Sequence, residues 1–260
     1  MSTTLQTKAQ SVSAKRLEGK VALVTGGSRG IGAGIALKLA EEGAAVALTY
    51  SKNKAKAETV VNQLQQLNVK AAAFHADASS EEESRELVEN VIKEFGKIDI
   101  LVNNAGVFEG APVDQITIEH YNRVFDVNVK GVIATTIAAV KKISDGGRII
   151  NISSVAATTK FTGFSVYSAT KAALNSLTRV WAQDLGARKI TVNAVAPGTT
   201  ASDMYDQALP EEAKKELIGK TALGRVGQPD DIAAVVAFLA SEEGRWITGQ
   251  IIEADGGINA

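Results

Sequence analysis

Residues 21–32 read Val-Ala-Leu-Val-Thr-Gly-Gly-Ser-Arg-Gly-Ile-Gly, and this stretch decides the fold. Its first part, Val21–Thr25, is an apolar, β-branched run of the kind that forms a strand buried on both faces. Glycines then allow a tight turn, and the apolar spacing that follows predicts a helix over 31–42. A strand, a glycine-rich turn and a helix in this order predict the first unit of a doubly wound α/β sheet.

The same alternation continues to the end of the chain. Further apolar runs predict strands over 45–50, 70–75, 98–102, 148–152, 190–195 and 250–253. Helical patterns occupy 54–67, 80–95, 129–140, 165–185 and 230–240. We therefore expect a single-domain Rossmann fold over 18–260, with a seven-stranded, mostly parallel sheet and helices on both faces. Residues 1–17 are polar and aperiodic, which predicts a disordered tail rather than a targeting signal.

Composition excludes several classes of function. The chain has no cysteine and only two histidines, so we expect neither disulfides nor a metal site built on these residues. The chain has 28 Lys and Arg residues and 29 Asp and Glu residues, so it lacks the excess of positive charge that is typical of nucleic-acid-binding proteins. No apolar run approaches the roughly 20 residues that span a bilayer. We expect a cytoplasmic protein with a small-molecule substrate.

The glycine-rich turn predicts a dinucleotide site. Gly26, Gly30 and Gly32 let the backbone approach a pyrophosphate, which the positive end of the following helix would attract. The literal G-x-G-x-x-G pattern is absent, because the spacing here is G-x-x-x-G-x-G. The P-loop pattern G-x-x-x-x-G-K-[ST] is also absent, which argues against an NTPase.

The end of the second predicted strand favours NADP over NAD. An NAD site offers a carboxylate there to the ribose 2′-hydroxyl, but this chain reads Tyr50-Ser51-Lys52. Arg29 in the glycine loop adds a second cation. These groups would attract the 2′-phosphate of NADP(H).

Tyr167 and Lys171 form the candidate reaction centre. They are four residues apart, so on a helix they share one face, and a nearby cation lowers the pKa of a phenol. Ser154 follows the strand 148–152 at the edge where such sheets bind ligands. A second pair with this spacing, Tyr50 and Lys54, straddles a strand-to-helix junction away from the predicted substrate cleft, and we interpret it as coincidence.

Together these residues resemble the short-subunit branch of the short-chain dehydrogenase/reductase family, over about residues 19–257. Further landmarks are Asn103–Gly106, Asn128 and Pro197-Gly198. The resemblance implies that Tyr167 is the acid/base and that Ser154, rather than Ser153, binds the carbonyl oxygen. It implies that Lys171 lowers the tyrosine pKa and holds the nicotinamide ribose. Asn128 would position a water that reprotonates Lys171.

The resemblance also implies a set of cofactor contacts. Asp77 would meet adenine, Asn104 the adenosine side, and Pro197-Gly198 the nicotinamide. Thr200 departs from the family, which often has an aliphatic residue there, and Ser202 would bind the carboxamide. The full expected set is Gly26, Ser28, Arg29, Gly30, Ile31, Gly32, Tyr50, Ser51, Lys52, Asp77, Ala78, Asn104, Ala105, Gly106, Tyr167, Lys171, Pro197, Gly198, Thr200 and Ser202.

Two predicted loops near the candidate reaction centre indicate the class of substrate. Residues 155–165 offer Phe161 and Phe164, and the lid-like segment 199–227 carries apolar residues, namely Met204, Tyr205 and Leu209. We expect an apolar pocket for ketones or aldehydes of moderate size, that is, a carbonyl reductase or ketoreductase.

Two alternatives stay open. The first is a 3-oxoacyl-[acyl-carrier-protein] reductase, for which Lys141, Lys142 and Arg188 are candidates for a basic patch at the cleft mouth. Against it, the connection 143–147 is short and weakly basic. The second is a non-catalytic dinucleotide sensor, which the presence of Ser154, Tyr167, Lys171 and Asn128 disfavours.

The predicted helices 129–140 and 165–185 are rich in apolar residues on every side, which favours burial of their outer faces between subunits. The resemblance implies that they pair in a dimer and that the C-terminal segment completes a homotetramer.

Overall fold

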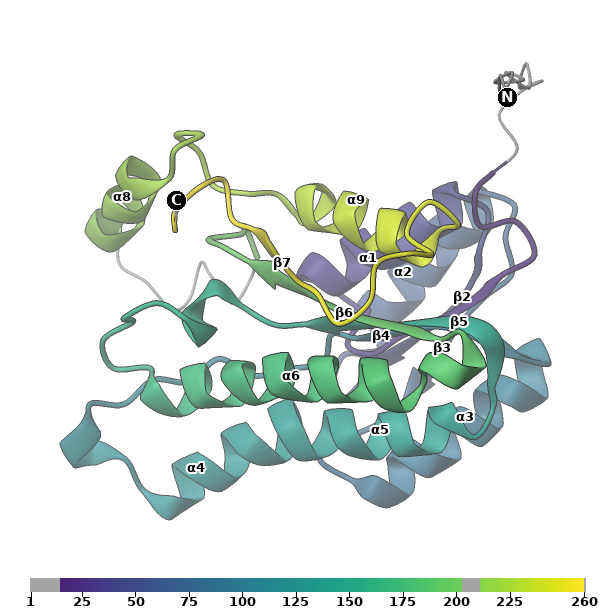
Figure 1. Cartoon of the computed structure of the whole chain (residues 1–260), viewed down its shortest axis with the longest axis horizontal. Helices are drawn as coiled ribbons and strands as arrows, with labels where there is room; N and C mark the ends of the chain where they lie inside the picture. Colours follow the sequence, from purple (N-terminus) through teal and green to yellow (C-terminus); the bar gives the residue numbers. More distant parts are fainter. Residues whose placement is uncertain (1–14, 203–210, 260) are drawn as a thin grey trace, which may run out of the picture.

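The computed structural model describes residues 15–202 and 211–259, and the strands of this part form one parallel sheet (Figure 1). Their order across the sheet is β3-β2-β1-β4-β5-β6-β7. The strands are β1 (Val21–Val24), β2 (Ala45–Tyr50), β3 (Ala71–His75), β4 (Ile98–Asn103), β5 (Ile143–Ile152), β6 (Thr191–Pro197) and β7 (Ile251–Ala254). The predicted Rossmann fold with seven strands is confirmed.

Helices cover both faces of the sheet. Those of the described residues are α1 (Gly30–Glu41), α2 (Lys54–Gln66), α3 (Glu81–Phe95), α4 (Ile118–Phe125), α5 (Gly131–Val140), α6 (Ser165–Asp184), α8 (Glu211–Lys220) and α9 (Pro229–Ala240). Figure 1 shows α1, α2 and α9 on one face and α3, α5 and α6 on the other. Two separate hydrophobic clusters lie between these helices and the sheet, one on each face. None of the described helices has both the length and the apolar content that a membrane span requires.

The strand order places the topological switch point of the sheet beside β1. The chain runs outward from β1 to β2 and β3, then crosses back to β4 on the other side of β1. Loops that leave the carboxyl ends of β1 and β4 therefore diverge to opposite faces, and open α/β sheets bind ligands at this point. The predicted glycine turn follows β1, and residues 104–107 follow β4.

One predicted connection is wrong. We expected residues 143–147 to form a loop, but they are the first half of β5, and Ile143 pairs with Ile98. The register shifts between Ile98 and Ile100, and Gly146 has a φ of +76°, so the strand is irregular where the sequence reads as a turn. The true connection from α5 to β5 is only Lys141-Lys142.

The predicted tail also extends too far. Leu17 is 1% exposed within the core, and its amide donates to the carbonyl of Glu42. The guanidinium of Arg16 binds both carboxylate oxygens of Glu42, at 2.9 and 2.7 Å. Residues 16 and 17 therefore belong to the folded domain, because Arg16 forms a bidentate ion pair and Leu17 is buried. Lys15 is also described, and its carbonyl accepts from the Glu18 amide at 3.1 Å, whereas residues 1–14 of the predicted tail lie outside the described residues.

Candidate active site

The glycine turn after β1 has a backbone that side chains would not tolerate. Gly26 and Gly30 have φ of +64° and +54°, in the left-handed region that favours glycine. A Cβ on Gly32 would lie 2.3 Å from the carbonyl oxygen of Gly26. The turn is fastened to β2, because the Gly26 amide donates to the Thr49 hydroxyl at 2.9 Å and the Gly27 amide to the Thr49 carbonyl at 3.0 Å.

The amino end of α1 fits an anionic group. The helix begins at Gly30, and the side chain of its N-cap residue, Arg29, makes no capping hydrogen bond. The first turn contains Ile31 and Gly32 and no acidic residue. Its amides are therefore positioned to donate to an external acceptor, and the helix dipole favours negative charge there. Ser28 is half-buried in the turn, and Arg29, at the N-cap position, is exposed. This glycine cradle and uncapped helix match the needs of a pyrophosphate.

The loop after β4 is bound to the glycine turn. The Asn104 side-chain amide donates to the carbonyls of Thr25 and Gly26, at 2.9 and 3.1 Å. The backbone amides of Asn104 and Ala105 both donate to the Thr25 hydroxyl at 3.0 Å. The Asn104 side chain thus holds the two loops together, and its predicted contact with the adenosine side of the cofactor stays a prediction. Sequence analysis missed Thr25 and Thr49, whose hydroxyls hold the two loops in place.

The ends of β2 and β3 lie next to the glycine turn, on the side of β1 away from β4. The Tyr50 ring packs edge-on against His75, with centroids 5.7 Å apart, and Ser51 and Lys52 are exposed. The Asp77 carboxylate accepts from the amide and hydroxyl of Ser79, and these bonds lower its pKa, with further help from the nearby charge of Lys52. The adjacent Ala78 carbonyl lies tightly against Gly131 at the start of α5.

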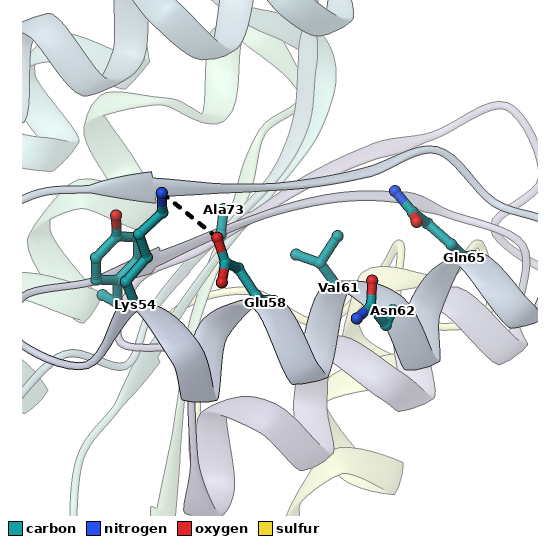
Figure 2. Close-up of a pocket in the computed structure, with 7 residues that line it drawn as sticks. Lys54, Glu58, Val61, Asn62, Gln65 and Ala73 are labelled. Atoms are coloured by element: carbon teal, nitrogen blue, oxygen red, sulfur yellow. Dashed lines mark ion pairs between the residues drawn. The ribbon is translucent and has the colours of Figure 1, made fainter.

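The second Tyr–Lys pair lies apart from the predicted catalytic residues. Tyr50 and Lys54 line a cavity of about 250 Å³ between α2 and the β2–β3 edge. Figure 2 shows the Lys54 ammonium pointing toward Glu58, with which it forms an ion pair at 3.4 Å. Neither Ser154 nor Tyr167 lines this cavity.

The structure brings Ser154, Tyr167 and Lys171 together at the carboxyl edge of the sheet. Tyr167 and Lys171 lie on the first turns of α6, and the ammonium is 5.6 Å from the centre of the phenol ring. The Ser154 hydroxyl is hydrogen-bonded to the phenol. Ser153, the rejected alternative, is buried, and its hydroxyl contacts the side-chain oxygen of Asn175 at 2.7 Å.

Burial governs the protonation of this pair. It raises the pKa of Tyr167 to about 12, although the hydrogen bond from Ser154 acts in the opposite direction. It lowers the pKa of Lys171 to about 8. The net shift of the Tyr167 pKa is therefore upward, opposite to the lowering expected from Lys171, whose ammonium donates to the Ile152 carbonyl at 2.9 Å.

A pH dependence of stability follows from the buried lysine. Lys171 has its ordinary pKa of 10.5 when unfolded and about 8 when folded. Between pH 8 and 10 the unfolded chain binds the extra proton, so the free energy of unfolding rises with pH, by up to about 1.4 kcal/mol per unit. Tyr167, with its ordinary pKa of 10.0 raised to about 12, titrates above this window.

Relative to Lys171→Met, the wild type should therefore gain about 2–3 kcal/mol between pH 8 and 10. Urea unfolding of both proteins at pH 7, 8, 9 and 10, without added nucleotide, measures this difference. Identical pH slopes for the two proteins would contradict the assigned burial of the ammonium.

Asn128 braces the loop after β4. It is fully buried in a π-helical turn (η2, Asp126–Lys130) between α4 and α5, a distortion often found at functional sites. Its side-chain oxygen accepts from the Val107 amide at 2.8 Å, and its amide donates to the Val107 carbonyl at 2.9 Å. The amide also reaches the Thr170 hydroxyl at 3.2 Å, one residue before Lys171. Its predicted role toward a water stays a prediction.

A series of hydrogen bonds between buried polar side chains joins the central strands β4 and β5 to the helices α5 and α6. The Asn103 amide donates to Thr136 on α5 and to Asn151 on β5, at 3.0 and 2.9 Å. The Asn151 amide in turn donates to Thr178 on α6 at 2.9 Å. The sequence does not predict this network, because each of its residues is typical of an ordinary strand or helix.

The loop after β6 closes the carboxyl edge. Gly198 packs against Asp255, where a Cβ would come within 2.7 Å of the Asp255 Cα. The Thr200 hydroxyl donates to the Gly198 carbonyl, and the residue is buried, so this side chain supports the loop, and its predicted cofactor contact stays a prediction. Ser202 lies against Gly30, beside the glycine turn. Pro197 ends β6, and Met204, Tyr205 and Leu209 of the predicted lid lie outside the described residues.

The cations proposed for a carrier-protein patch lie at the wrong edge. Lys141 and Lys142 precede β5, and Arg188 precedes β6, so all three lie at the amino ends of parallel strands. Lys142 pairs with Glu89 at 3.2 Å. Arg188 binds Asp145 and two backbone carbonyls. These cations cannot form the mouth of a site at the carboxyl edge.

Comparison with known proteins agrees with this architecture. The sequence profile described as Enoyl-(Acyl carrier protein) reductase matches residues 26–259. An uncharacterized oxidoreductase of Methylorubrum extorquens is 50% identical, over 94% of this chain and 99% of that protein. The 3-oxoacyl-[acyl-carrier-protein] reductase FabG of Staphylococcus aureus is 43% identical, over 92% and 98% respectively.

Solved structures also share this fold. A short-chain dehydrogenase of Burkholderia cenocepacia, in complex with NADP, superimposes with a TM-score of 0.90. It is 44% identical, and the match covers 94% of this chain and all of that chain. With its glycine cradle, its Tyr–Lys pair and these relatives, the chain belongs to the short-chain dehydrogenase/reductase family of oxidoreductases.

Proposed function

We propose that the protein is an NADPH-dependent reductase that converts a ketone or aldehyde to the alcohol, with Tyr167 as the proton donor. The convergence of Ser154, Tyr167 and Lys171 beside the glycine cradle carries this proposal. A Cβ on Gly106 would lie 3.7 Å from the Lys171 ammonium, and the loop that contains Gly106 is bound to the glycine turn. Nucleotide held in the cradle would therefore extend toward the phenol.

Ser154, Tyr167 and Lys171 would each have a different role in the reaction. NADPH would supply the hydride that adds to the carbonyl carbon. The Ser154 hydroxyl would orient the carbonyl oxygen, and the Tyr167 phenol would give that oxygen its proton, so the product is neutral. Lys171, whose lowered pKa lies near neutrality, is suited to return a proton to the phenolate.

The choice of NADPH rests on charge. Arg29 at the start of α1 and Lys52 after β2 are exposed, and β2 ends on Tyr50 without a carboxylate. Arg29→Ala should lower the ratio of kcat/KM for NADPH over NADH by about tenfold to a hundredfold, since a charge-assisted contact contributes roughly 1.5–3 kcal/mol.

Arg85→Ala is the matched control for that measurement. Arg85 is an exposed α3 arginine that pairs with Glu82, so its loss should leave the cofactor ratio unchanged. A wild-type preference for NADH, or an Arg29→Ala protein with unaltered selectivity, would reject the NADPH assignment.

Reduction of a 3-oxoacyl thioester on an acyl carrier protein is the second candidate, favoured by the 43% identity with FabG of Staphylococcus aureus. The position of Lys142 and Arg188 at the far edge removes one support for it. Turnover of acetoacetyl thioester compared with free ketones, with NADPH consumption as the readout, separates the two reactions.

A homotetramer is the proposed assembly. Ile137 on α5 and Val180 on α6 are 57% and 55% exposed, and Trp246 before β7 is 95% exposed. Large apolar side chains at these places would be covered by other subunits. Ile137→Glu should shift the sedimentation of the protein toward smaller species at micromolar concentration, and a wild-type monomer would contradict the proposal.

A further inference from the structure

Four aromatic rings form a continuous row that ends at the candidate proton donor. The row runs Phe161, Phe164, Phe108, Tyr167. Adjacent ring centres are 4.7, 4.3 and 4.8 Å apart. Phe108 and Phe164 are parallel to within 10°, whereas Phe108 stands at 89° to Tyr167. We call these four residues the aromatic row.

The aromatic row is fixed by the backbone around it. Phe164 immediately precedes α6, and its carbonyl accepts from the Ser168 amide at 2.8 Å, so it lies on the same helical turn as Tyr167. The Ala111 amide donates to the Gly163 carbonyl at 2.7 Å and joins the loop that carries Phe108 to the loop that carries Phe164. A Cβ on Gly110 would come within 2.7 Å of the Phe164 ring. Phe108 is therefore held in contact with both rings.

The aromatic row belongs to the surface of the site. All four side chains are half-buried, unlike the fully buried leucines and isoleucines of the core. In residues 107–111 and 155–165 the only charged side chains are Glu109 and Lys160, and Glu109 pairs with Arg123 at 3.1 Å. The wall beside Tyr167 thus presents rings rather than an anion clamp.

Resting on the proposed function, we infer that the preferred substrates are ketones that carry a planar aromatic ring, and that Phe108 is a specificity-determining residue. A carbonyl oxygen in contact with the Tyr167 hydroxyl places the substituents of the substrate beside Phe108, the next ring in the row. Aliphatic groups gain only burial there. An aromatic ring also gains stacked or edge-to-face contact, which favours it by about two- to tenfold.

Two ketones that differ only in ring saturation test this inference. 2-Tetralone and 2-decalone have the same bicyclic skeleton and carbonyl position, but only the first carries an aromatic ring. The readout is the ratio of their kcat/KM values with NADPH, in which any general loss of activity cancels. The wild-type ratio should be about two to ten, and Phe108→Leu should reduce it to about one.

Two further variants separate recognition from support of the fold. Phe108→Tyr keeps the ring and should keep the ratio. Phe74→Leu removes a phenyl ring from β3, where Phe74 packs near Phe95, and should leave the ratio unchanged. A wild-type ratio near one, or a Phe108→Leu protein that loses both activities equally, would overturn the inference.

A binding measurement separates this inference from the reaction itself. Calorimetry in the presence of NADP⁺ should show that 2-tetralol binds about two- to tenfold more tightly than 2-decalol, and that Phe108→Leu removes the difference. Equal affinities, or no binding of either alcohol, would reject the aromatic site. The protein could bind 2-tetralol selectively and yet consume no NADPH with either ketone or with acetoacetyl thioester. That result would reject the proposed reaction and retain the aromatic site.

Discussion

Tyr167→Phe is expected to lower kcat for ketone reduction by about 10²–10⁴-fold, because it removes the one group placed to protonate the developing alkoxide. The substitution deletes a single oxygen and keeps the ring against Phe108, so the aromatic row should persist. NADPH affinity should stay within a few-fold of wild type. Steady-state kinetics for kcat and fluorescence titration for NADPH binding measure the two quantities separately.

The pH profile provides a second signature of the same residue. Oxidation of an alcohol requires the phenolate, and burial raises the pKa of Tyr167 to about 12. Below that value each pH unit increases the phenolate fraction about tenfold, so the oxidative rate should climb with pH, whereas reduction uses the protonated phenol and should favour lower pH. In Tyr167→Phe the rising oxidative limb should disappear.

Tyr50→Phe is the matched control, since it removes a phenol hydroxyl from the other Tyr–Lys pair. Tyr50→Phe keeps the ring that packs against His75, together with any contact of that ring with the cofactor, and neither Ser154 nor Tyr167 lines the cavity that Tyr50 lines. Turnover should therefore stay within a few-fold of wild type. If Tyr167→Phe kept most of its turnover on the best substrate, the proton would have to come from Ser154 or from water, and the mechanism proposed here would be wrong.

The parts of the fold that sequence predicts are those set by local pattern. Apolar runs mark strands buried on both faces, and the i, i+4 spacing of Tyr167 and Lys171 places both on one side of α6. The beginning of β5 was missed because Gly146-Gly147 reads as a turn. Only the pairing of Ile143 with Ile98, forty-five residues earlier, shows that the strand begins there.

The parts of the site that sequence does not predict depend on contacts between distant segments. Phe108 enters the aromatic row because its loop is hydrogen-bonded to residue 163. Thr25 and Thr49 hold the glycine turn through hydroxyls that read as ordinary strand residues. The direction of the Tyr167 pKa was also mistaken, because the spacing of Tyr167 and Lys171 shows their proximity and not their depth of burial.

Gly32→Ala is expected to reduce nucleotide affinity by about 10²-fold, the scale of effect that a displacement of roughly 1 Å can have in a preorganised site. The new Cβ would lie 2.3 Å from the Gly26 carbonyl oxygen and 2.4 Å from the Asn104 side-chain nitrogen. The first of these atoms is backbone, so the start of α1 must move away from the glycine turn. That movement misaligns the first-turn amides that would bind the pyrophosphate.

Alanine otherwise stabilises a helix relative to glycine by about 1 kcal/mol, so a loss at position 32 isolates the close approach of the two backbone segments. Gly186→Ala is the matched control, because a Cβ there meets nothing within 4 Å and the residue precedes β6, at the opposite edge of the sheet. NADPH titration should show a large loss for Gly32→Ala and none for Gly186→Ala, and the free energy of unfolding should fall by about 1–3 kcal/mol only in the former. Equal NADPH affinity in Gly32→Ala and wild type would mean that the nucleotide does not bind against the start of α1, and the cofactor site would have to be placed elsewhere.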